Sequence, residues 1–547
     1  MFILKDYLYL LRVILVLTCA YLLAVLVKQS FFNLTLSDFS TYYYIPKAVL
    51  HIARPEHPYS NLIPYYPFFY PPQSIPMFGI LSLVPFYIAK YIWTIINVLL
   101  AIKSLLLING FFNKKVGLEF WIMFLGLLVF YPFQFTLRDG QFNIAILFLF
   151  VYLAKIIIEK RNILVGVLLS MGIVTKVSPL IVLFYLALKK RYKMVIYTAI
   201  CILILTIIGE VLVRNGISYY YLRFVLKDVS TQALVPTYLD QSILGFLRRV
   251  DIKAFELSGF LISANLIRTF LSYGITLLLT LSLLLWSYKH KLKNNFLLTY
   301  CGLVVIGIVG SGLSWFHQYV ILLFPLYIVF LNVNRLKTSK RYYLSIVTFL
   351  TYLLMYKNLI DTYKGFFQLN LLFGAIIILV LLSYLISIKN EYLEKEVLLE
   401  PLKSSTSIWI LFIAVFIIAL NPFTFNDYLK EGRDRARVRG VDHIAEVLRE
   451  YKPGFKIGVA NSYEKSEKVD EGYILFKSSN GLYKERISLL FLDPINNSKF
   501  NYKFESTSED DFSLSAKLES KYYKNRYGDE YKYLCKSDKC SMKQDIP

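Results

Sequence analysis

Apolar segments of roughly 20 residues follow one another through residues 1–420 of the chain. An α-helix needs about 20 such residues, at ~1.5 Å each, to cross the hydrocarbon core of a bilayer. The predicted spans, about thirteen in number, cover roughly residues 9–29, 88–110, 119–135, 142–158, 162–175, 177–188, 193–213, 268–288, 296–313, 317–334, 342–358, 368–388 and 406–420. This pattern excludes a single soluble enzyme, a disordered protein and a fibrous protein.

The predicted fold class is an all-α polytopic membrane protein, with a helical bundle over residues 1–420 and a small α+β domain over residues 421–547. This second region has ordinary soluble composition. It begins with a charged helical stretch at 427–451, and short strand-like runs such as KIGVA and GYILF follow it.

Basic residues gather in the short loops between the apolar segments. Of the formal net charge of +23, residues 1–420 carry +21 and residues 421–547 carry +2. Excess lysine and arginine marks cytoplasmic loops, so we expect a cytoplasmic location for 111–115, 159–162, 189–193, 289–293, 335–341 and the linker from 389. The N-terminus is then cytoplasmic in a plasma or inner membrane, while the loops at 30–87 and 214–267 and the C-terminal domain are extracytoplasmic. Since the charge follows membrane orientation, nucleic-acid binding is not expected.

Three segments depart from simple spans. Residues 72–86 are short and rich in proline, which predicts a re-entrant or interfacial segment with both ends outside. Residues 162–188 have basic flanks at both ends yet are too short for two spans. Two half-length helices that meet at 176–179, with Pro179 as the breaker, satisfy both facts. A lateral amphipathic helix is expected near 241–250.

Cysteine usage leaves one question open. Cys19, Cys201 and Cys301 lie in apolar segments, where buried free thiols are expected. Cys535 and Cys540 lie in the C-terminal region, and a disulfide between them would form only if that region is exported. No spacing of cysteine and histidine is typical of a zinc site.

Asp38 lies in the first outward loop, just past the first span and among aromatic residues. A carboxylate there can act as a general base on an acceptor hydroxyl. It can equally begin the helix that the following residues predict. The dense tyrosines and prolines of this loop suit either a groove for sugar rings or an interfacial aromatic belt.

Polar residues after the third span form a second candidate group. Arg138 would hold a phosphate, while Gln141 and Asn143 would hydrogen-bond to hydroxyl groups. The alternative for Arg138 is an ion pair with its neighbour Asp139.

Two single residues stand out at the ends of apolar runs. Lys176 is costly to bury without a partner or water, and phosphate is a natural partner for its compact ammonium. The alternative is that it extends to the interface. His317 would donate to a phosphate or hydroxyl group, or play a structural role beside Trp315. All of these residues, with the weaker candidates Asp240 and Gln241, fall on the outer face under the orientation given by the basic loops.

Short motifs in this order resemble glycosyltransferase family 87. They are D-F-x-x-Y-Y at 38–43, P-Y-S at 58–60, F-x-Y-P-P at 68–72, G-Q-x-N at 140–143, K-x-x-P at 176–179, Q-S-x-x-G at 241–245 and S-W-x-H at 314–317. The resemblance covers about residues 30–330. It implies a GT-C-like helical bundle that transfers mannose or another hexose from a polyprenyl-phosphate donor at the outer face. It also implies that Asp38 is the catalytic base. This chain has Gln318 after His317, where the family more usually has a second histidine.

The sequence therefore predicts inverting hexosyl transfer to a glycolipid or glycan acceptor, with mannose as the hexose that the family resemblance favours. Asp38 would be the base, and Arg138, Lys176 and His317 would bind the donor phosphate. Substrate contacts are predicted for Tyr42, Tyr43, Tyr70, Gln141, Asn143 and Gln241. No cofactor is expected, and no metal, because the chain has no D-x-D pair to hold one. The alternatives are a lipid or lipid-linked sugar flippase, and a membrane scaffold for the C-terminal region.

Overall fold

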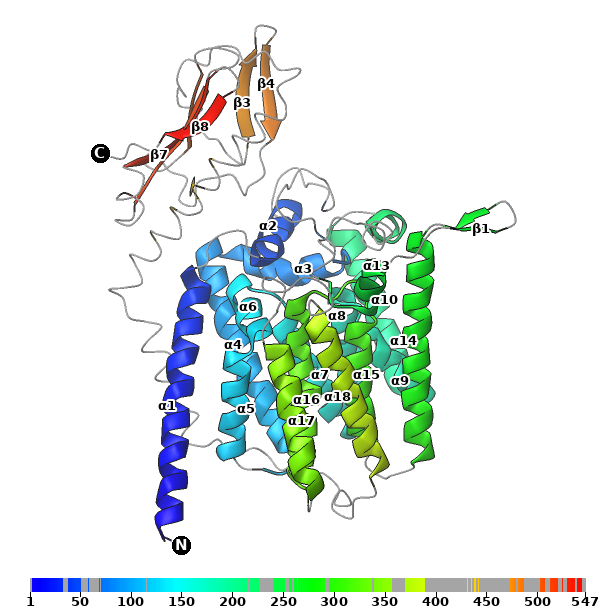
Figure 1. The fold of residues 1–547 in the computed structure, drawn as a ribbon. Coiled ribbons are helices and arrows are strands. Elements are labelled where there is room, and N and C mark those ends of the chain that lie inside the picture. The colour runs from blue at the N-terminus through cyan, green and yellow to red at the C-terminus, as the bar shows by residue number, and fades with distance from the viewer. Residues whose placement is uncertain are drawn as a thin grey trace. The chain divides into compact units, whose positions relative to one another are not determined.

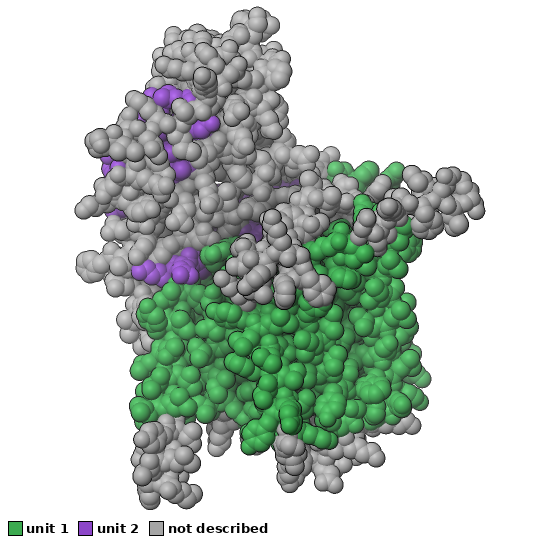
Figure 2. Space-filling view, in the orientation of Figure 1, with its two compact units in different colours: residues 1–27, 69–77, 92–415 green, residues 28–68, 78–91, 416–547 purple. Residues whose placement is uncertain are grey.

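The computed structural model describes residues 2–388 with gaps, and parts of residues 430–543. The longer gaps before residue 388 are 51–67, apart from Pro58, together with 226–239 and 357–368. Beyond it, the described residues are isolated helical positions between 430 and 441, position 524, and the strands with some of their ends. The chain divides into two compact units, which Figure 2 colours separately: unit 1 is Met1–Val27, Phe69–Met77 and Ile92–Val415, and unit 2 is Lys28–Phe68, Phe78–Tyr91 and Phe416–Pro547.

Helices dominate residues 2–388, and the long ones of unit 1 run side by side (Figure 1). They are α1 (Phe2–Phe32), α2 (Asp38–Leu50), α3 (Ser74–Gly79), η1 (Ile80–Leu83), α4 (Phe86–Gly110), α5 (Leu118–Val129), α6 (Tyr131–Asp139), α7 (Asn143–Ile158), α8 (Asn162–Thr175), α9 (Leu180–Leu188), α10 (Tyr192–Leu212), α11 (Ile217–Tyr220), η2 (Tyr221–Val225), α13 (Ile243–Arg249), α14 (Ala264–Lys289), α15 (Asn295–Val309), η4 (Phe316–Leu322), α16 (Leu323–Val333), α17 (Ser339–Tyr356) and α18 (Asn370–Ser387). A small antiparallel pair, β1 (Phe255–Leu257) and β2 (Phe260–Ile262), precedes α14.

Six helices among the described residues are long and apolar enough to cross a membrane, or seven if α5 and α6 count as one bent span. These helices indicate a membrane protein. The expected count of about thirteen spans is not confirmed, since several expected spans form apolar helices of only 10–17 residues. The expected span at 406–420 lies outside the described residues.

Burial differs sharply among these candidate spans. The most apolar window of Phe316–Val333 is 89% buried within the protein, whereas that of α10 is only 11% buried. A long helix that exposes apolar side chains over most of its surface suits contact with lipid. The core of unit 1 therefore lies around η4 and α16, with α10 near its periphery.

The expected span at 119–135 is broken in the structure. Helix α5 ends at Val129, Phe130 has an extended backbone, and α6 leaves at an angle of 62°. Pro132 lies in the first turn of α6, where no backbone N–H is needed. In a continuous helix, residue 132 would have to donate an N–H to the carbonyl oxygen four residues earlier, which proline cannot do. A single straight span was therefore a wrong prediction here.

The two half-helices expected at 162–188 and the helix expected near 241–250 are present, whereas the re-entrant placement of 72–86 stays a prediction. Residues 162–188 form α8 and α9, separated at Lys176–Pro179. Residues 72–86 contain α3 and η1, which together are too short to cross a bilayer. The amphipathic helix expected near 241–250 is α13, whose N-cap Ser242 accepts a hydrogen bond from the Gly245 N–H.

One end of unit 1 is fixed by a set of paired polar groups, here called the Glu119 cluster: Lys114, Glu119 and Asn334. Lys114 forms an ion pair with Glu119, whose other oxygen accepts from Asn334 at 3.4 Å. Arg335 donates to the carbonyl oxygen of Phe112 at 2.6 Å. Two basic loops that the sequence places on the cytoplasmic side, 111–115 and 335–341, thus begin at the same end of this unit.

The described C-terminal residues form antiparallel sheets. Strands β3 (Tyr473–Ser478) and β4 (Gly481–Arg486) form one hairpin, while β5 (Tyr502–Ser506), β6 (Phe512–Lys517), β7 (Glu530–Lys536) and β8 (Lys539–Lys543) form a four-stranded sheet in that order. Cys535 and Cys540 are directly opposite each other on β7 and β8. Opposed residues of antiparallel strands lie about 4.5 or 5.5 Å apart, within the Cα separation of a disulfide. A separate α+β domain over 421–547 stays a prediction, and KIGVA lies outside the described residues.

Candidate active site

Three of the predicted site residues meet in unit 1, and we call them the Lys176 cluster: Asn143, Lys176 and His317. Asn143 is the first residue of α7, Lys176 caps the C-terminus of α8, and His317 lies in η4. The Lys176 ammonium donates to the side-chain oxygen of Asn143. It also lies close enough to His317 to interact electrostatically with the imidazole. The motifs G-Q-x-N, K-x-x-P and S-W-x-H thus converge although they are far apart in the sequence.

The break between α8 and α9 sets the position of Lys176. Pro179 cannot continue the hydrogen-bond ladder of α8, so the helix ends and Lys176 adopts an extended backbone, with its N–H bonded to the carbonyl oxygen of Gly172 at 2.8 Å. A Cβ atom at Gly172 would lie 2.3 Å from Leu149 and 3.2 Å from Pro179. The small size of Gly172 therefore lets the end of α8 pack closely against α7 and against Pro179.

A glycine turn positions Asn143. Gly140 has φ of 69°, a left-handed conformation that ends α6, and its carbonyl oxygen accepts from the Trp93 indole at 2.8 Å. The chain then passes through the buried Gln141 and Phe142 into α7. Trp93 also stacks on Phe142, with ring centroids 5.7 Å apart.

Buried nitrogen atoms without partners gather around Lys176. Among the described residues, three buried side-chain nitrogen atoms here have no hydrogen-bond partner: Nδ2 of Asn143, Nδ1 of His317 and Nε1 of Trp315. The His317 backbone is fixed, because its carbonyl oxygen accepts from the Thr136 hydroxyl at 3.1 Å. Leaving a buried polar group unpaired costs about 1–3 kcal/mol. These unpaired groups are therefore costly unless a ligand supplies their acceptors.

Arg138 lies outside this cluster but next to it. Its guanidinium lies 4.6 Å from the centroid of the Phe135 ring, which in turn is nearly parallel to the His317 ring. Arg138 also forms the ion pair with Asp139 that the sequence leaves open, at 3.1 Å, and its side chain is 44% exposed. The structure thus shows the ion pair with Asp139, which is the alternative role of Arg138. The ring of Phe135 lies between the Arg138 guanidinium and the His317 ring.

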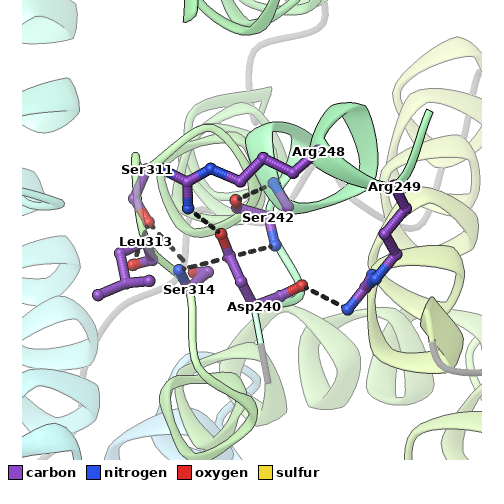
Figure 3. Close-up of polar contacts among 8 residues, drawn as sticks. Asp240, Ser242, Arg248, Arg249, Ser311, Leu313 and Ser314 are labelled. Carbon is purple, nitrogen blue, oxygen red and sulfur yellow. Dashed lines mark hydrogen bonds and ion pairs between the residues drawn. The ribbon is translucent and has the colours of Figure 1, made fainter. Parts of the chain in front are cut away.

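A buried carboxylate joins two more motifs (Figure 3). Asp240 is fully buried, and its Oδ1 accepts from the backbone N–H groups of Ser242 and Ser314, both at 3.0 Å. Its Oδ2 faces Arg248 at 3.5 Å, and its backbone carbonyl oxygen accepts from Arg249 at 3.1 Å. Burial raises the pKa of Asp240, and the hydrogen bonds with the nearby Arg248 partly offset this rise.

Gln241 is also part of this junction. Its backbone N–H donates to the Ser314 carbonyl oxygen at 2.8 Å, its own carbonyl oxygen accepts from Tyr319 at 2.6 Å, and its side chain is fully buried. Gly245 completes the motif, because a Cβ atom there would lie 2.5 Å from the Asp240 carbonyl oxygen. Q-S-x-x-G therefore packs against S-W-x-H, which gives Gln241 a structural role beside the predicted substrate contact.

The remaining predicted residues lie elsewhere. Asp38 begins α2 in unit 2, as its alternative role of helix start requires, and is partly exposed. Tyr42 is buried against Phe78, with ring centroids 4.6 Å apart. Tyr43 is buried too and donates to the Val84 carbonyl oxygen at 2.8 Å, and burial raises its pKa. Both tyrosines thus contribute packing to unit 2. Tyr70 is partly exposed in unit 1.

Comparison with protein families tests the resemblance that the motifs suggest. Residues 68–312 match glycosyltransferase family 87. This match confirms the resemblance over these residues, and the family that they match is one of glycosyltransferases. No curated protein and no solved structure matches the chain.

The family 87 match covers only part of the candidate site. Arg138, Asn143, Lys176 and Gln241 lie inside the matched residues, whereas Asp38 and His317 lie outside them. The match spans less than half of the 547-residue chain and includes neither α2 nor η4. The roles of Asp38 and His317 therefore depend on the motifs and on the geometry.

Sequence reasoning missed two residues of this region. Asp240 was among the weakest candidates. Two arginines follow it by eight and nine positions, at the end of a short helix, and this pattern could have indicated that they pair with the carboxylate. Trp315 was interpreted only as a neighbour of His317. Its buried indole nitrogen has no sequence signal, because tryptophan is expected at membrane interfaces in any case.

Proposed function

We propose that this protein is an inverting glycosyltransferase that moves a hexose, with mannose the first choice, from a polyprenyl-phosphate donor to an acceptor hydroxyl. The acceptor is a glycolipid or glycan, and the reaction takes place at the outer face of the membrane. The family 87 match over residues 68–312 supports glycosyl transfer. The hexose, the donor, the acceptor, inversion and the outer face are the parts that this proposal adds.

The observation that carries the donor assignment is the Lys176 cluster. An ammonium group, a buried amide N–H and a buried imidazole nitrogen come together there, and the two side-chain nitrogens of Asn143 and His317 have no partner among the described residues. A phosphate supplies oxygen acceptors and a negative charge to all three groups.

In the reaction, Asp38 takes the proton from the acceptor hydroxyl, and the acceptor oxygen attacks the anomeric carbon. The bond between this carbon and the phosphate oxygen breaks, and polyprenyl phosphate leaves with the electron pair. Lys176 and His317 stabilise the negative charge that grows on the departing phosphate. One displacement inverts the anomeric centre, so a single base is enough. The base assignment comes from the resemblance of the 38–43 motif.

Arg138 has a secondary role in this proposal. Its ion pair with Asp139 holds it above Phe135, one ring away from His317. From there it adds positive potential near the phosphate and can be released from Asp139 when the donor binds. Tyr70, Gln141 and Gln241 remain proposed contacts to the sugar or the acceptor.

The placement of basic loops supports reaction at the outer face. Helix α7 runs from Asn143 to the loop at 159–162, and α8 returns from that loop to Lys176. A helix of 16 residues is about 24 Å long. The Lys176 cluster and this basic loop are therefore at opposite ends of α7, and basic loops favour the cytoplasmic side.

A transfer assay with purified full-length protein tests the proposal. Wild type and Asp38→Asn would each receive radiolabelled polyprenyl-phosphate mannose and a crude membrane-lipid extract. We expect a labelled product with wild type only, and equal expression of the variant. A panel of other polyprenyl-phosphate hexoses extends the assay if mannose is not transferred.

Two results would contradict the proposal. Full activity of Asp38→Asn would show that Asp38 is not the catalytic base. Movement of intact labelled donor across proteoliposomes, without product from any donor of the panel, would instead establish a flippase.

A further inference from the structure

The segment that carries His317 is anchored by a carboxylate that the reaction does not use. Asp240 accepts the Ser314 N–H through its side chain, while Gln241 donates to the Ser314 carbonyl oxygen. Asp240 and Trp315 also form an antiparallel bridge. Both backbone groups of Ser314 are therefore held by two consecutive residues of one loop.

The same loop holds the far side of the segment. Tyr319, two residues past His317, donates its hydroxyl to the Gln241 carbonyl oxygen at 2.6 Å. The Gln318 N–H bonds back to the Trp315 carbonyl oxygen at 2.9 Å. His317 is thus bracketed by attachments at 314 and 319, and its orientation depends on the position of the Asp240 loop.

Asp240 itself cannot be a base. It is fully buried, one oxygen accepts two backbone N–H groups, and the other faces Arg248. A proton acceptor in catalysis must reach the substrate within hydrogen-bond distance. The role that remains is to hold the loop and the 314–319 segment together.

We propose that Asp240 is a positioning residue, which through the Ser314 N–H sets the orientation of His317 and Trp315 at the Lys176 cluster. This inference rests on the proposed function, since it assigns to the segment a role in binding the departing phosphate. Arg248 balances the charge of the carboxylate, so that Asp240 can stay ionised while buried. A charged acceptor makes the stronger hydrogen bond to the Ser314 N–H.

The experiment compares Asp240→Asn with the matched control Glu119→Gln in the full-length protein. Asparagine keeps the shape but loses the charge and turns a donor toward Arg248. Glu119→Gln makes the same change from carboxylate to amide in the Glu119 cluster, where the side chain pairs with Lys114 and Asn334 instead. A third variant, Asp240→Asn with Arg248→Gln, replaces the ion pair by two amides that can bond to each other.

Two readouts are measured on each variant. Hydrogen exchange followed by mass spectrometry reports on the peptide 311–318, independently of activity. Transfer from polyprenyl-phosphate mannose gives kcat and the donor KM. For Asp240→Asn we expect faster exchange in 311–318 and a kcat lower by about tenfold with little change in KM, the result of a lost interaction that acts in the transition state.

The control and the double variant sharpen the interpretation. Glu119→Gln should leave exchange in 311–318 and kcat within about twofold of wild type, and Arg248→Gln should restore part of the kcat lost in Asp240→Asn. Unchanged exchange in 311–318 of Asp240→Asn would overturn the anchor. Faster exchange with unchanged kcat would overturn the positioning role. If wild type transfers no sugar from any donor, the proposed function fails, and the exchange readout still decides whether the anchor exists.

Discussion

The two ends of unit 1 each hold a lysine beside an asparagine, but they use them differently. At the Glu119 cluster, Lys114 pairs with a carboxylate and Asn334 donates to the same carboxylate. At the Lys176 cluster, the lysine donates to a neutral amide, whose own Nδ2 has no partner among the described residues. The first arrangement is closed and ties loops together. The second leaves the amide nitrogen of Asn143 without a partner among the described residues, and our proposal assigns this nitrogen to the donor phosphate.

The largest expected difference between the two ends is in transfer activity. Lys176→Met should lower kcat/KM by about 100-fold, because a hydrogen bond between charged groups contributes about 1.5–3 kcal/mol and 1.36 kcal/mol is a factor of ten. Lys114→Met removes a lysine of the same length at the other end and should stay within about twofold. Equal losses in the two variants, measured by the transfer assay at matched protein levels, would show that the comparison is wrong.

A pair of asparagine variants separates activity from stability. Asn143→Leu should lower transfer about tenfold, and it should lower the melting temperature slightly, because it also removes the oxygen that accepts from Lys176. Asn334→Leu should leave transfer unchanged and lower the melting temperature slightly, because it removes a bond to Glu119. Both values come from the transfer assay and from thermal unfolding of the purified protein. A large fall in stability for Asn143→Leu would assign that residue to the fold instead.

The glycine turn before Asn143 should matter through backbone strain. Gly140→Ala places a side chain at φ of 69°, which costs about 1–2 kcal/mol, so melting temperature and transfer should fall together. Gly274→Ala is the control, since a Cβ atom there meets nothing within 4 Å and alanine is favoured inside α14. A stable Gly140→Ala protein with normal transfer would mean that this turn does not position Asn143.

The smallest effect is expected for Glu119→Gln. The Lys114–Glu119 pair is partly exposed to solvent, and such pairs contribute about 0–1 kcal/mol. Thermal unfolding should therefore change little, and transfer not at all. Any loss of transfer above about twofold would connect this end of unit 1 to the reaction and remove the contrast between the clusters.

Sequence reasoning succeeded where one residue type dictates the backbone. Pro179 ends α8 regardless of its surroundings, so the break that exposes Lys176 was predictable. Pro132 was ambiguous, because proline is tolerated in the first turn of a helix as well as being a breaker inside one, and the 62° bend between α5 and α6 was missed. The convergence of 143, 176 and 317 followed from orientation alone, since each lies at the same end of its own span.

The remaining features depend on tertiary contacts that no local pattern encodes. Whether Arg138 pairs with Asp139 or stays free was open in the sequence, and the ring of Phe135 decides where the guanidinium lies. The anchor at Asp240 is made to the backbone of Ser314, 74 positions away, and backbone groups carry no sequence signature. Tyr42 and Tyr43 resemble sugar-binding aromatics in the sequence, yet unit 2 uses both as packing residues.

The interruption at Lys176–Pro179 also bears on how the protein enters its membrane. Helices of 14 and 9 residues extend about 21 and 14 Å, less than the roughly 30 Å hydrocarbon core, so neither half spans a bilayer by itself. Gly166 packs against the backbone of Tyr197 in α10, and Gly172 packs on Leu149 in α7, so two neighbouring helices support α8. His317 lies in η4, beyond α10 in the chain, so the Lys176 cluster can be complete only after η4 has been synthesised.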